Sequence, residues 1–426
     1  MILFYRVLTN ILYPLFILII FTRKFLGKED VSRYKEKIFS SCFKVERDNN
    51  KKLIWFHSAS LGELKSIFPI IKELNKEKNI EFLITSVTLS SSLLAKEQFK
   101  NIPNVRHRFF PIDVFFLIKK FLNLWKPDVI FLVDSEIWPN LILLAKRKKI
   151  PLALINARIT NKTFRKWKLV LGFARKIFNS FDLCLSSSME TKRYLEFLST
   201  KNIYYEGNLK LISHINKDNI KNINEEFLSK NRFWIAASTH QGEDEFCIKT
   251  HIKLKEKFKD IYTIIAPRHI ERTKKILSFC QKNNLNCQLI NKNDKIFLEK
   301  EIIIINSYGL LSSYFKFAKS VFIGKSTLPK FEKAGGQSPI EAAFLGCKVY
   351  HGPFINNFKE VYEIFEKNNI TRKVMNSKEL SNLLIKDLED TSKDLYRFSE
   401  FMNNLYNKTL LNNMRIINNF LFNETF

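Results

Sequence analysis

The hydrophobic pattern divides the chain into an apolar N-terminal stretch and two long regions in which strands and helices alternate. From Lys51 onward, short runs rich in β-branched and aromatic residues are followed by stretches with apolar residues at helical spacing. The first region predicts strands at Leu53–His57, Glu81–Val87, Val129–Asp134, Leu152–Asn156 and Leu183–Ser186. The second predicts strands at Phe233–Ala237, Tyr262–Ala266, Gln288–Asn291, Ile302–Asn306, Ser320–Ile323 and Lys348–Tyr350. Continuous apolar strands alternating with helices are typical of parallel sheets covered on both faces, so two doubly wound α/β domains are expected.

Changes in composition set the expected domain limits. Residues 213–231 are polar, rich in Asn and Lys and poor in strand formers, which predicts a linker. We therefore expect an N-terminal segment over 1–28, a first domain over 29–212 and a second over 232–389. Residues 390–426 have a helical pattern and are expected to pack back across the first domain. Ligands of such sheets bind beyond the carboxyl ends of strands, so chemistry is expected in the loops after strands.

Met1–Phe21 is the one strong targeting signal, because it is almost wholly apolar and is followed by Arg23, Lys24 and Lys28. A signal peptide is a poor match, since no basic lead precedes the apolar stretch and no small-residue cleavage site follows it. The stretch barely reaches the roughly 20 residues of a spanning helix, and Arg6 would be costly in a bilayer. An interfacial helix, a short single span and a buried core helix remain open. In the first two cases the basic flank keeps the body on the cytoplasmic side of the inner membrane.

Charge favours anionic partners. Lys and Arg outnumber Asp and Glu by 70 to 42, which gives a formal net charge of +28. Nucleic acid is not expected as a partner, because no zinc-finger spacing or RNP-like aromatic motif is present. The six cysteines are scattered without metal-ligand spacing, and the sequence has no P-loop, no G-x-G-x-x-G after a strand and no D-x-D. We therefore expect no metal site and no cofactor.

The loop Ser58–Glu63 follows the first predicted strand. Gly62 is expected to permit a tight turn from strand to helix, which places Glu63 in the first helical turn. There the helix macrodipole is expected to stabilise the charged carboxylate, as a general base requires. A simple helix-capping role for Glu63 explains the pattern equally well.

Three loops of the second domain could bind a nucleotide. Ser238–Glu243 offers hydroxyls and backbone N–H groups at a helix start, which suits an anion. Arg268 follows the next strand, where its guanidinium fork matches phosphate or carboxylate oxygens, whereas the neighbouring His269 is expected to make a structural hydrogen bond.

In the third loop, Gly335–Glu341, Ser338 fits an N-cap, Pro339 the first helical position and Glu341 a capping box. The double glycine is expected to let a ligand approach the backbone, and Glu341 could also accept ribose hydroxyls.

Seven stretches, in order along the chain, carry a family resemblance. They are Ser58–Glu63, Glu136–Asn140, Asn156–Arg158, Gly207–Lys210, Ala237–Glu243, Pro267–Arg272, and Gly335–Glu341 followed by Gly352-Pro353. With them the chain resembles the 3-deoxy-D-manno-octulosonic acid (Kdo) transferases of lipopolysaccharide synthesis. The membrane-proximal N-terminal helix of that family also fits Met1–Phe21, and its basic stretch fits the residues near Arg33.

The resemblance implies a GT-B glycosyltransferase, with two Rossmann-like domains facing a cleft and an N-terminal membrane-anchoring helix. It implies metal-independent, inverting transfer of Kdo from CMP-Kdo to lipid IVA, the phosphorylated lipid A precursor, at an anionic membrane surface. By position, Glu63 is implied as the general base. The implied CMP contacts are Pro267, Arg268, Gly309, Leu310, Leu311, Ser338, Pro339, Ile340 and Glu341. Further candidates for substrate binding are Ser238, Thr239, Glu136, Arg158 and Lys210.

The sequence departs from the family pattern at some of these positions. Gly309-Leu310-Leu311 stands where Gly-Glu-Leu is usual, Gln337-Ser338 replaces His-Asn, and Gly324-Lys325-Ser326 replaces Gly-Gly-Ser. Two other functions stay open, a GT-B transferase that uses a UDP-sugar and a lipid acceptor, and a basic membrane-associated scaffold without activity. The positions of Glu63 and Arg268 directly after strands favour an enzyme.

Overall fold

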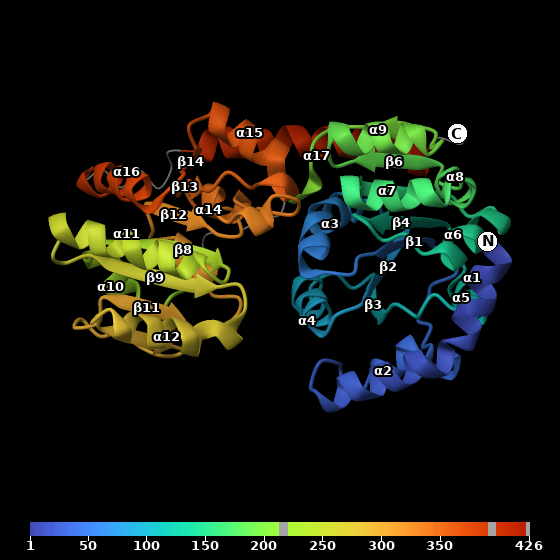
Figure 1. The fold of residues 1–426 in the computed structure, drawn as a ribbon. Coiled ribbons are helices and arrows are strands. Elements are labelled where there is room, and N and C mark those ends of the chain that lie inside the picture. The colour runs from blue at the N-terminus through green and yellow to red at the C-terminus, as the bar shows by residue number, and fades with distance from the viewer. Residues whose placement is uncertain (213–219, 391–397, 423–426) are drawn as a thin grey trace. The chain divides into compact units, whose positions relative to one another are not determined.

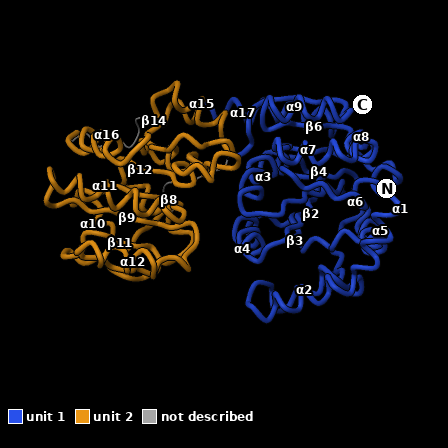
Figure 2. Tube along the Cα trace, in the orientation of Figure 1, with its two compact units in different colours: residues 1–214, 405–426 blue, residues 215–404 orange. Residues whose placement is uncertain are grey.

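Two parallel sheets organise the chain, one in each of two compact units. In this computed structural model, the described residues are 1–212, 220–390 and 398–422. Residues 1–214 and 405–426 form the first unit and residues 215–404 form the second (Figure 2). Residues 213–219 of the expected linker and 391–397 of the expected C-terminal segment lie outside the described residues.

The first unit has a seven-stranded sheet in the order β3-β2-β1-β4-β5-β6-β7, in which every pairing is parallel. Its strands are β1 (Lys52–His57), β2 (Ile80–Ser86), β3 (Val105–Phe109), β4 (Val129–Val133), β5 (Leu152–Ala157), β6 (Leu183–Ser186) and β7 (Ile203–Tyr204). Its helices are α3 (Leu61–Leu74), α4 (Leu89–Gln98), α5 (Phe115–Trp125), α6 (Pro139–Arg147), α7 (Asn161–Leu169), α8 (Leu171–Phe178) and α9 (Met189–Phe197). The long helix α17 (Ser399–Phe422) reaches this unit from the end of the second (Figure 1).

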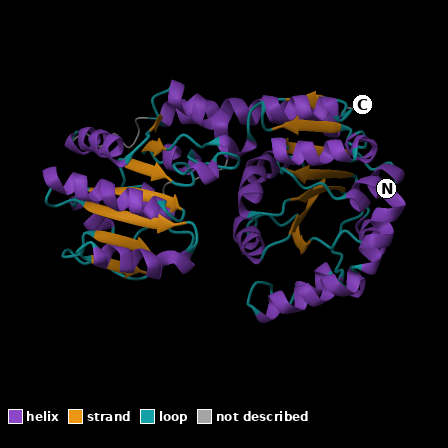
Figure 3. Ribbon diagram, in the orientation of Figure 1, coloured by secondary structure: helices purple, strands orange, loops and turns teal. Residues whose placement is uncertain are grey.

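The side-chain alternation of β1 explains why this sheet is covered on both faces. Ile54 and Phe56 point into one core, with α3, α4 and α17, while Leu53 and Trp55 point into the opposite core, with α5, α6, α8 and α9. Side chains in a strand alternate between faces, so the uninterrupted apolar run at residues 53–56 of β1 must be buried on both sides. Figure 3 shows helices on both faces of the strands.

The second unit repeats this architecture, with strand order β10-β11-β9-β8-β12-β13-β14 and only parallel pairings. Its strands are β8 (Phe233–Thr239), β9 (Tyr262–Pro267), β10 (Cys287–Ile290), β11 (Ile302–Ile305), β12 (Ser320–Ile323), β13 (Lys348–His351) and β14 (Thr371–Lys373). Its helices are α10 (Glu225–Lys230), α11 (Glu243–Lys257), α12 (Thr273–Lys282), α13 (Leu311–Phe315), α14 (Ile340–Phe344), α15 (Lys359–Lys367) and α16 (Ser377–Glu389). The prediction of two doubly wound α/β domains is therefore confirmed.

Short connecting turns and one unexpected helix complete the elements. The 3-10 turns are η1 (Tyr34–Lys37), η2 (Ser40–Cys42), η3 (Leu209–Ile212), η4 (Ile270–Arg272), η5 (Pro329–Phe331) and η6 (Asn356–Phe358). Helix α10 lies within the segment expected to be a linker, and its Leu228 is buried in the core of the second unit. Residues 225–230 are thus part of a folded domain, because Leu228 and the neighbouring Phe227 both pack against its core.

The strand order reverses once in each sheet, which marks where ligands are expected. In the first unit β1 lies between β2 and β4, so consecutive strands leave β1 in opposite directions. In the second unit β8 lies between β9 and β12 in the same way. Crevices at such switch points, beyond the carboxyl ends of the strands, are the usual binding sites of doubly wound sheets.

The apolar N-terminal stretch forms two helices instead of the single helix expected over Met1–Phe21. Helix α1 (Ile2–Ile11) and helix α2 (Tyr13–Phe25) meet at a bend of 51°. Pro14 lies in the first turn of α2 and has no N–H to donate, so the hydrogen-bond ladder is interrupted there. In the part of the chain that the structure describes, no single helix has the length and apolarity to cross a membrane, whereas this bent pair has them together.

Helix α1 is held to the first unit by polar as well as apolar contacts. The Tyr5 hydroxyl donates to Oδ2 of the buried Asp113 at 2.9 Å, and the Arg6 guanidinium lies 4.4 Å from the centre of the Phe115 ring. Burial raises the pKa of Asp113 to about 6. Many apolar side chains of both helices remain exposed, including Leu3, Phe4, Ile11, Leu18 and Phe25.

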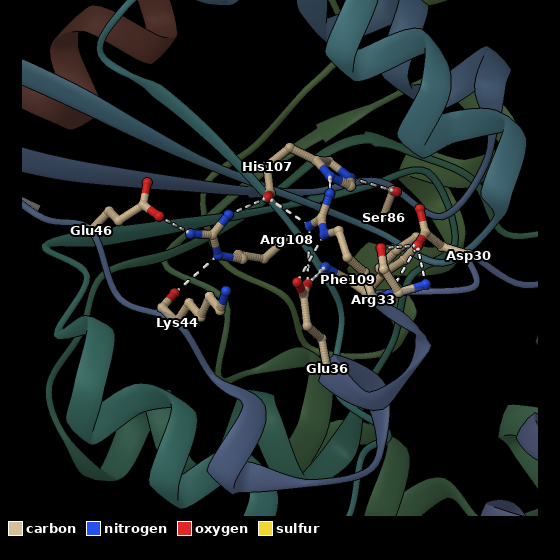
Figure 4. Close-up of polar contacts among 10 residues, drawn as sticks. Asp30, Arg33, Glu36, Lys44, Glu46, Ser86, His107, Arg108 and Phe109 are labelled. Atoms are coloured by element: carbon tan, nitrogen blue, oxygen red, sulfur yellow. Dashed lines mark hydrogen bonds and ion pairs between the residues drawn. The ribbon is translucent and has the colours of Figure 1, made fainter.

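The segment between α2 and β1 is fastened to the edge strand β3 by charged groups (Figure 4). Arg33 donates to both carboxylate oxygens of Glu36, at 2.8 and 3.0 Å, and to the backbone oxygen of His107 at 2.9 Å. Glu36 in turn accepts the backbone N–H of Phe109 at 2.9 Å. Arg33 lies in the part of the chain that fits the basic stretch of the family. Here it belongs to a structural network that joins η1 to β3.

Candidate active site

Glu63 lies at the start of α3, directly beyond the carboxyl end of β1. Ser60 is the N-cap of this helix, and its hydroxyl accepts the Glu63 backbone N–H at 3.4 Å and donates to Glu63 Oε1 at 2.7 Å. Glu63 Oε2 accepts backbone N–H groups from Ala59 at 2.6 Å and from Ser60 at 3.3 Å. The helix-capping role considered for Glu63 from the sequence is therefore present, in the form of a capping box with Ser60. A carboxylate offers about four acceptor positions, so one position on Oε1 remains for a ligand.

The electrostatic environment of Glu63 differs from the expectation that the helix dipole dominates. The side chain is buried, and burial is the largest of the effects that raise its pKa. The negative charges of Glu136 and Asp134 raise the pKa further, whereas hydrogen bonds from Ser60 and Ala59 lower it. The carboxyl of Glu63 therefore stays neutral to higher pH than that of a solvent-exposed glutamate, because the cost of desolvating its charge outweighs the stabilisation by the helix N-terminus. A carboxyl with a raised pKa is a stronger proton acceptor once it is ionised.

Glu136 is fixed beside this loop by two aromatic partners. Its Oε2 accepts the indole N–H of Trp138 at 2.8 Å and lies 3.2 Å from Nε2 of His57. The His57 ring is fully buried at the end of β1, with Nδ1 2.9 Å from the Thr85 hydroxyl. Sequence reasoning missed His57, although its place immediately before the Ser58–Glu63 loop was a usable signal.

Asp134, Arg158 and Lys210 gather at the ends of β4 and β5. Lys210 Nζ donates to Asp134 Oδ2 at 2.7 Å, and the backbone N–H of Arg158 donates to the Asp134 carbonyl at 3.0 Å. Asp134, directly after β4, and Asn156, within an irregular part of β5, both have positive φ angles, of 63° and 50°. The first unit therefore brings four of the predicted residues, Glu63, Glu136, Arg158 and Lys210, to one edge of its sheet.

Gly62 is not required by the turn that it was expected to permit. Its φ angle is not positive, and a Cβ atom added there would meet nothing within 4 Å. The residue lies inside the first turn of α3 and is exposed. The backbone therefore does not require glycine at position 62. The absence of a side chain there leaves open space next to Glu63.

In the second unit, β8 and β9 present the Ser238–Thr239 and Pro267–Arg268 positions at neighbouring strand ends. The backbone N–H of Arg268 donates to the Thr239 carbonyl at 3.0 Å, so the two loops are joined directly. The Arg268 side chain is exposed, and no described residue makes a hydrogen bond or ion pair with its guanidinium. Ser238 has a positive φ of 56° at a break in the strand register, so its hydroxyl leaves the strand pattern.

The expected anion site at the start of α11 is partly filled by the protein itself. The Thr239 hydroxyl donates to Asp244 Oδ1 at 2.8 Å, and Asp244 also pairs with Arg272. His269, expected to make a structural hydrogen bond, is exposed, and its ring lies 5.6 Å from that of His240. Among the residues described, none makes a hydrogen bond to the His269 ring.

Glu243 organises the loop that follows β12. Its fully buried carboxylate accepts backbone N–H groups from Lys325 at 2.6 Å, Ser326 at 2.7 Å and Thr327 at 3.1 Å. It also accepts the His240 N–H at 2.9 Å. With its lone pairs used in this way, Glu243 positions two loops at the switch point of the second sheet and is not available as a base.

The predicted contacts at Gly309–Leu311 and Ser338–Glu341 lie side by side, but their local roles differ from expectation. Glu341 does not close a capping box, because its Oε1 accepts the hydroxyl of Ser312 in α13. Pro339 is the N-cap of α14, and the Ser338 hydroxyl accepts the Ile340 N–H at a long 3.4 Å. The Glu341–Ser312 bond ties α13, which follows β11, to α14.

The double glycine has a packing function. A Cβ atom at Gly335 would lie 2.3 Å from the Phe354 carbonyl oxygen, and one at Gly336 would lie 2.9 Å from Ile355 Cα. The 354–355 backbone fills the space on the Cβ side of both glycines, so close packing explains the double glycine without a ligand. Gly309 differs, since it is exposed and open on its Cβ side.

Comparisons with known proteins match this chain to one family over most of its length. Residues 32–213 match the model of the family described as 3-deoxy-D-manno-octulosonic-acid transferase (kdotransferase). A "3-deoxy-D-manno-octulosonic acid transferase" of Rickettsia bellii is 30% identical over 98% of this chain and 97% of its own length. A "probable" mitochondrial enzyme of the same name from Arabidopsis thaliana is 32% identical over 86% of this chain and 82% of its own.

Solved structures share the fold at low sequence identity. A glycosyltransferase from Rickettsia africae has a TM-score of 0.58 and 14% identity, over 88% of this chain and all of that one. A UDP-GlcNAc 2-epimerase from Neisseria meningitidis, bound to UDP-GlcNAc, has a TM-score of 0.59 and 15% identity over 87% and 99% of the two chains. These likenesses establish the GT-B type fold.

Proposed function

The chain belongs to the Kdo transferase family, and on that premise we propose that it transfers Kdo from CMP-Kdo to lipid IVA, the phosphorylated lipid A precursor. The observation that carries the proposed chemistry is the Glu63 carboxyl, which is buried at the switch point of the first sheet with one free acceptor position. The family relationship supplies the sugar, and the site supplies a base suited to activate a hydroxyl.

In the proposed reaction, Glu63 Oε1 takes the proton from a primary hydroxyl of the acceptor. The hydroxyl oxygen forms a bond to the anomeric carbon of Kdo from the face opposite CMP, and the bond from that carbon to the CMP phosphate oxygen breaks. The configuration at the anomeric carbon is thereby inverted. Burial of Glu63 supports this role, because a desolvated carboxyl with a raised pKa is a better base than a solvated one.

We assign the donor nucleotide to the strand ends of the second unit. Arg268 is exposed directly after β9, where its guanidinium can take a phosphate or carboxylate in a bidentate manner. The backbone at Ser238, the open Gly309 and the Glu341–Ser312 pair lie at the same edge of the sheet. Leu310 and Leu311, which stand where the family has Glu-Leu, would contact the nucleotide through their backbone.

The donor assignment predicts a specific loss for Arg268→Ala. Removing a charge-assisted pair of hydrogen bonds should weaken CMP binding by about 1.5–3 kcal/mol, while the melting temperature stays near that of wild type because the side chain is exposed. Calorimetric titration with CMP measures the first quantity and differential scanning fluorimetry the second. Unchanged CMP affinity would remove Arg268 from the donor site.

We also propose that the enzyme works at the inner membrane, with both units on the cytoplasmic side. The exposed apolar side chains of α1 and α2, the basic residues Arg23, Lys24 and Lys28, and the net charge of +28 support this location. Lipid IVA and the anionic membrane surface would both be attracted to such a protein.

The decisive experiment combines the purified chain with a CMP-Kdo generating system and a tetra-acylated lipid A precursor, followed by mass spectrometry. We expect the acceptor mass to increase by one or more Kdo units, and the gain to disappear without the CMP-Kdo generating system. A parallel thermal-shift measurement with CMP and UDP tests the donor class. Protection by UDP but not CMP, with no Kdo product, would favour a UDP-sugar transferase instead.

A further inference from the structure

The helical hairpin formed by α7 and α8, residues 161–178, has an unusual surface composition. It contains six basic residues, Lys162, Arg165, Lys166, Lys168, Arg175 and Lys176, and no acidic residue. None of the nine residues of α7 is buried. Helix α8, in contrast, buries Ala174, Ile177 and Phe178 in the core of the first unit. Helix α7 packs against the same core through the half-buried Phe164 and Trp167, and its other side faces solvent.

The outward side of α7 combines charge with an exposed apolar tip. Lys162, Arg165, Lys166 and Leu169 follow one another at positions i, i+3, i+4 and i+7, which places them on one face of the helix. Leu169 is 85% exposed at the turn into α8. Within the described ranges, the three cations of this stripe form no ion pair. Such a face, with cations around a projecting leucine, matches the pattern of helices that lie at a membrane interface.

The hairpin also adjoins the apolar N-terminal helices. The ring of Phe173 in α8 lies 6.3 Å from the ring of Tyr5 in α1, and Trp167 lies 6.4 Å from the same Phe173 ring. In Figure 1, helices α1 and α8 lie near the N-terminus, at the same end of the first unit. The hairpin therefore contacts α1, a helix on which Phe4 and Leu8 are exposed.

From this placement we propose that the α7–α8 hairpin is a second membrane-contacting surface, which binds anionic phospholipid headgroups through Lys162, Arg165 and Lys166 and inserts Leu169 into the bilayer. This inference rests on the membrane location proposed above. It adds a contact that fixes the rotation of the first unit about α1 and α2. A membrane is favoured over a nucleic acid because an exposed leucine and a half-buried tryptophan accompany the cations.

Two measurements on the full-length chain test the proposal. The first is partition into vesicles of phosphatidylcholine alone or with about 30% of the anionic lipid phosphatidylglycerol, which gives the surface a negative potential. The triple variant Lys162→Ala, Arg165→Ala, Lys166→Ala should bind the anionic vesicles at least about tenfold more weakly, because each basic residue near such a surface changes partition roughly fivefold. The matched control Arg372→Ala, Lys373→Ala, Lys378→Ala removes the same charges from exposed positions of the second unit and should bind like wild type.

The second measurement reports contact directly. A nitrobenzoxadiazole label at Leu169→Cys, in a Cys42→Ser, Cys287→Ser background, should become brighter and blue-shifted on anionic vesicles and be quenched by nitroxide-labelled acyl chains. The same label at Leu298→Cys, exposed in the second unit, should not change. Loss of RNA oligonucleotide binding in the triple variant, with vesicle affinity unchanged, would overturn the proposal. A label at position 169 that stays in water would also overturn it. Neither measurement requires the sugar donor or the acceptor, so a failure of this proposal is distinguishable from a failure of the proposed Kdo transfer.

Discussion

Glu63 closes the N-terminal turn of α3 with the same carboxyl that we propose as the base. Three of its acceptor positions are used by Ala59 and Ser60, which fixes the direction of the fourth. The capping role and the catalytic role suggested by the sequence are therefore compatible, because the cap orients the group that would accept the proton. A rigidly oriented base needs no reorganisation when the substrate arrives.

Glu63→Gln separates the two roles. The amide cannot accept a proton near neutral pH, so turnover should fall by about 10²–10⁴-fold, while CMP affinity stays unchanged. One cap hydrogen bond is also lost, because the amide nitrogen and the Ala59 N–H are both donors, at a cost of about 1 kcal/mol. Transfer rate and melting temperature measured on the same preparation check this result. A variant that is slightly unstable but fully active would leave Glu63 with capping alone.

Glu136→Gln should move the pH dependence of the reaction. The Glu136 charge raises the pKa of Glu63, so removing the charge lowers that pKa. Activity requires ionised Glu63 and is lost as pH falls through its pKa, so the acidic limb of kcat/KM should shift to lower pH. The control Glu77→Gln removes an exposed charge beyond the other end of α3 and should leave the profile in place. An acidic limb that does not move would show that Glu136 acts only through its bonds to His57 and Trp138.

At the scale of elements, apolar runs located most strands, whereas polar edge elements were missed. Strand β3 reads Val-Arg-His-Arg-Phe, and its place in the sheet depends on Arg33 and Glu36, which are distant in sequence. Strands β7 and β14 have only two and three residues, too few for a periodic signal. In the same way, the Glu341–Ser312 bond joins residues 29 positions apart, which no local capping rule could anticipate.

The loops of the second unit depend on Glu243, whose carboxylate accepts backbone N–H groups from four loop residues. Glu243→Gln places an amide nitrogen against backbone donors, so the second unit should lose about 3 kcal/mol of unfolding free energy, and CMP affinity should fall with it. Glu245→Gln, two residues further along α11 and exposed, is the matched control. Chemical denaturation and CMP titration measure the two effects. Normal stability with lost turnover would instead make Glu243 a candidate for the chemistry.

For the whole molecule, the N-terminal helices and the surplus charge should act on membrane binding together. Deleting residues 1–25 removes the exposed apolar side chains of α1 and α2, so the remaining chain should leave membranes without detergent. Its residual binding to anionic vesicles should fall as salt is raised, because surface charges are screened. Fractionation and vesicle sedimentation at low and high salt check both expectations. A truncated chain that still needs detergent would place the anchor elsewhere.

Helix α17 also affects the order in which the protein can be completed during synthesis. Residues 405–426 belong to the first unit, and Met414, Ile417 and Phe420 fill the same core as β1 and α3. The second unit, in contrast, is made from the continuous stretch 215–404. A ribosome therefore releases every part of the second unit before the last part of the first. The unit that holds Glu63 must wait with an incomplete core while its successor in the chain folds, and chaperones that shelter apolar surfaces would be needed most during that interval.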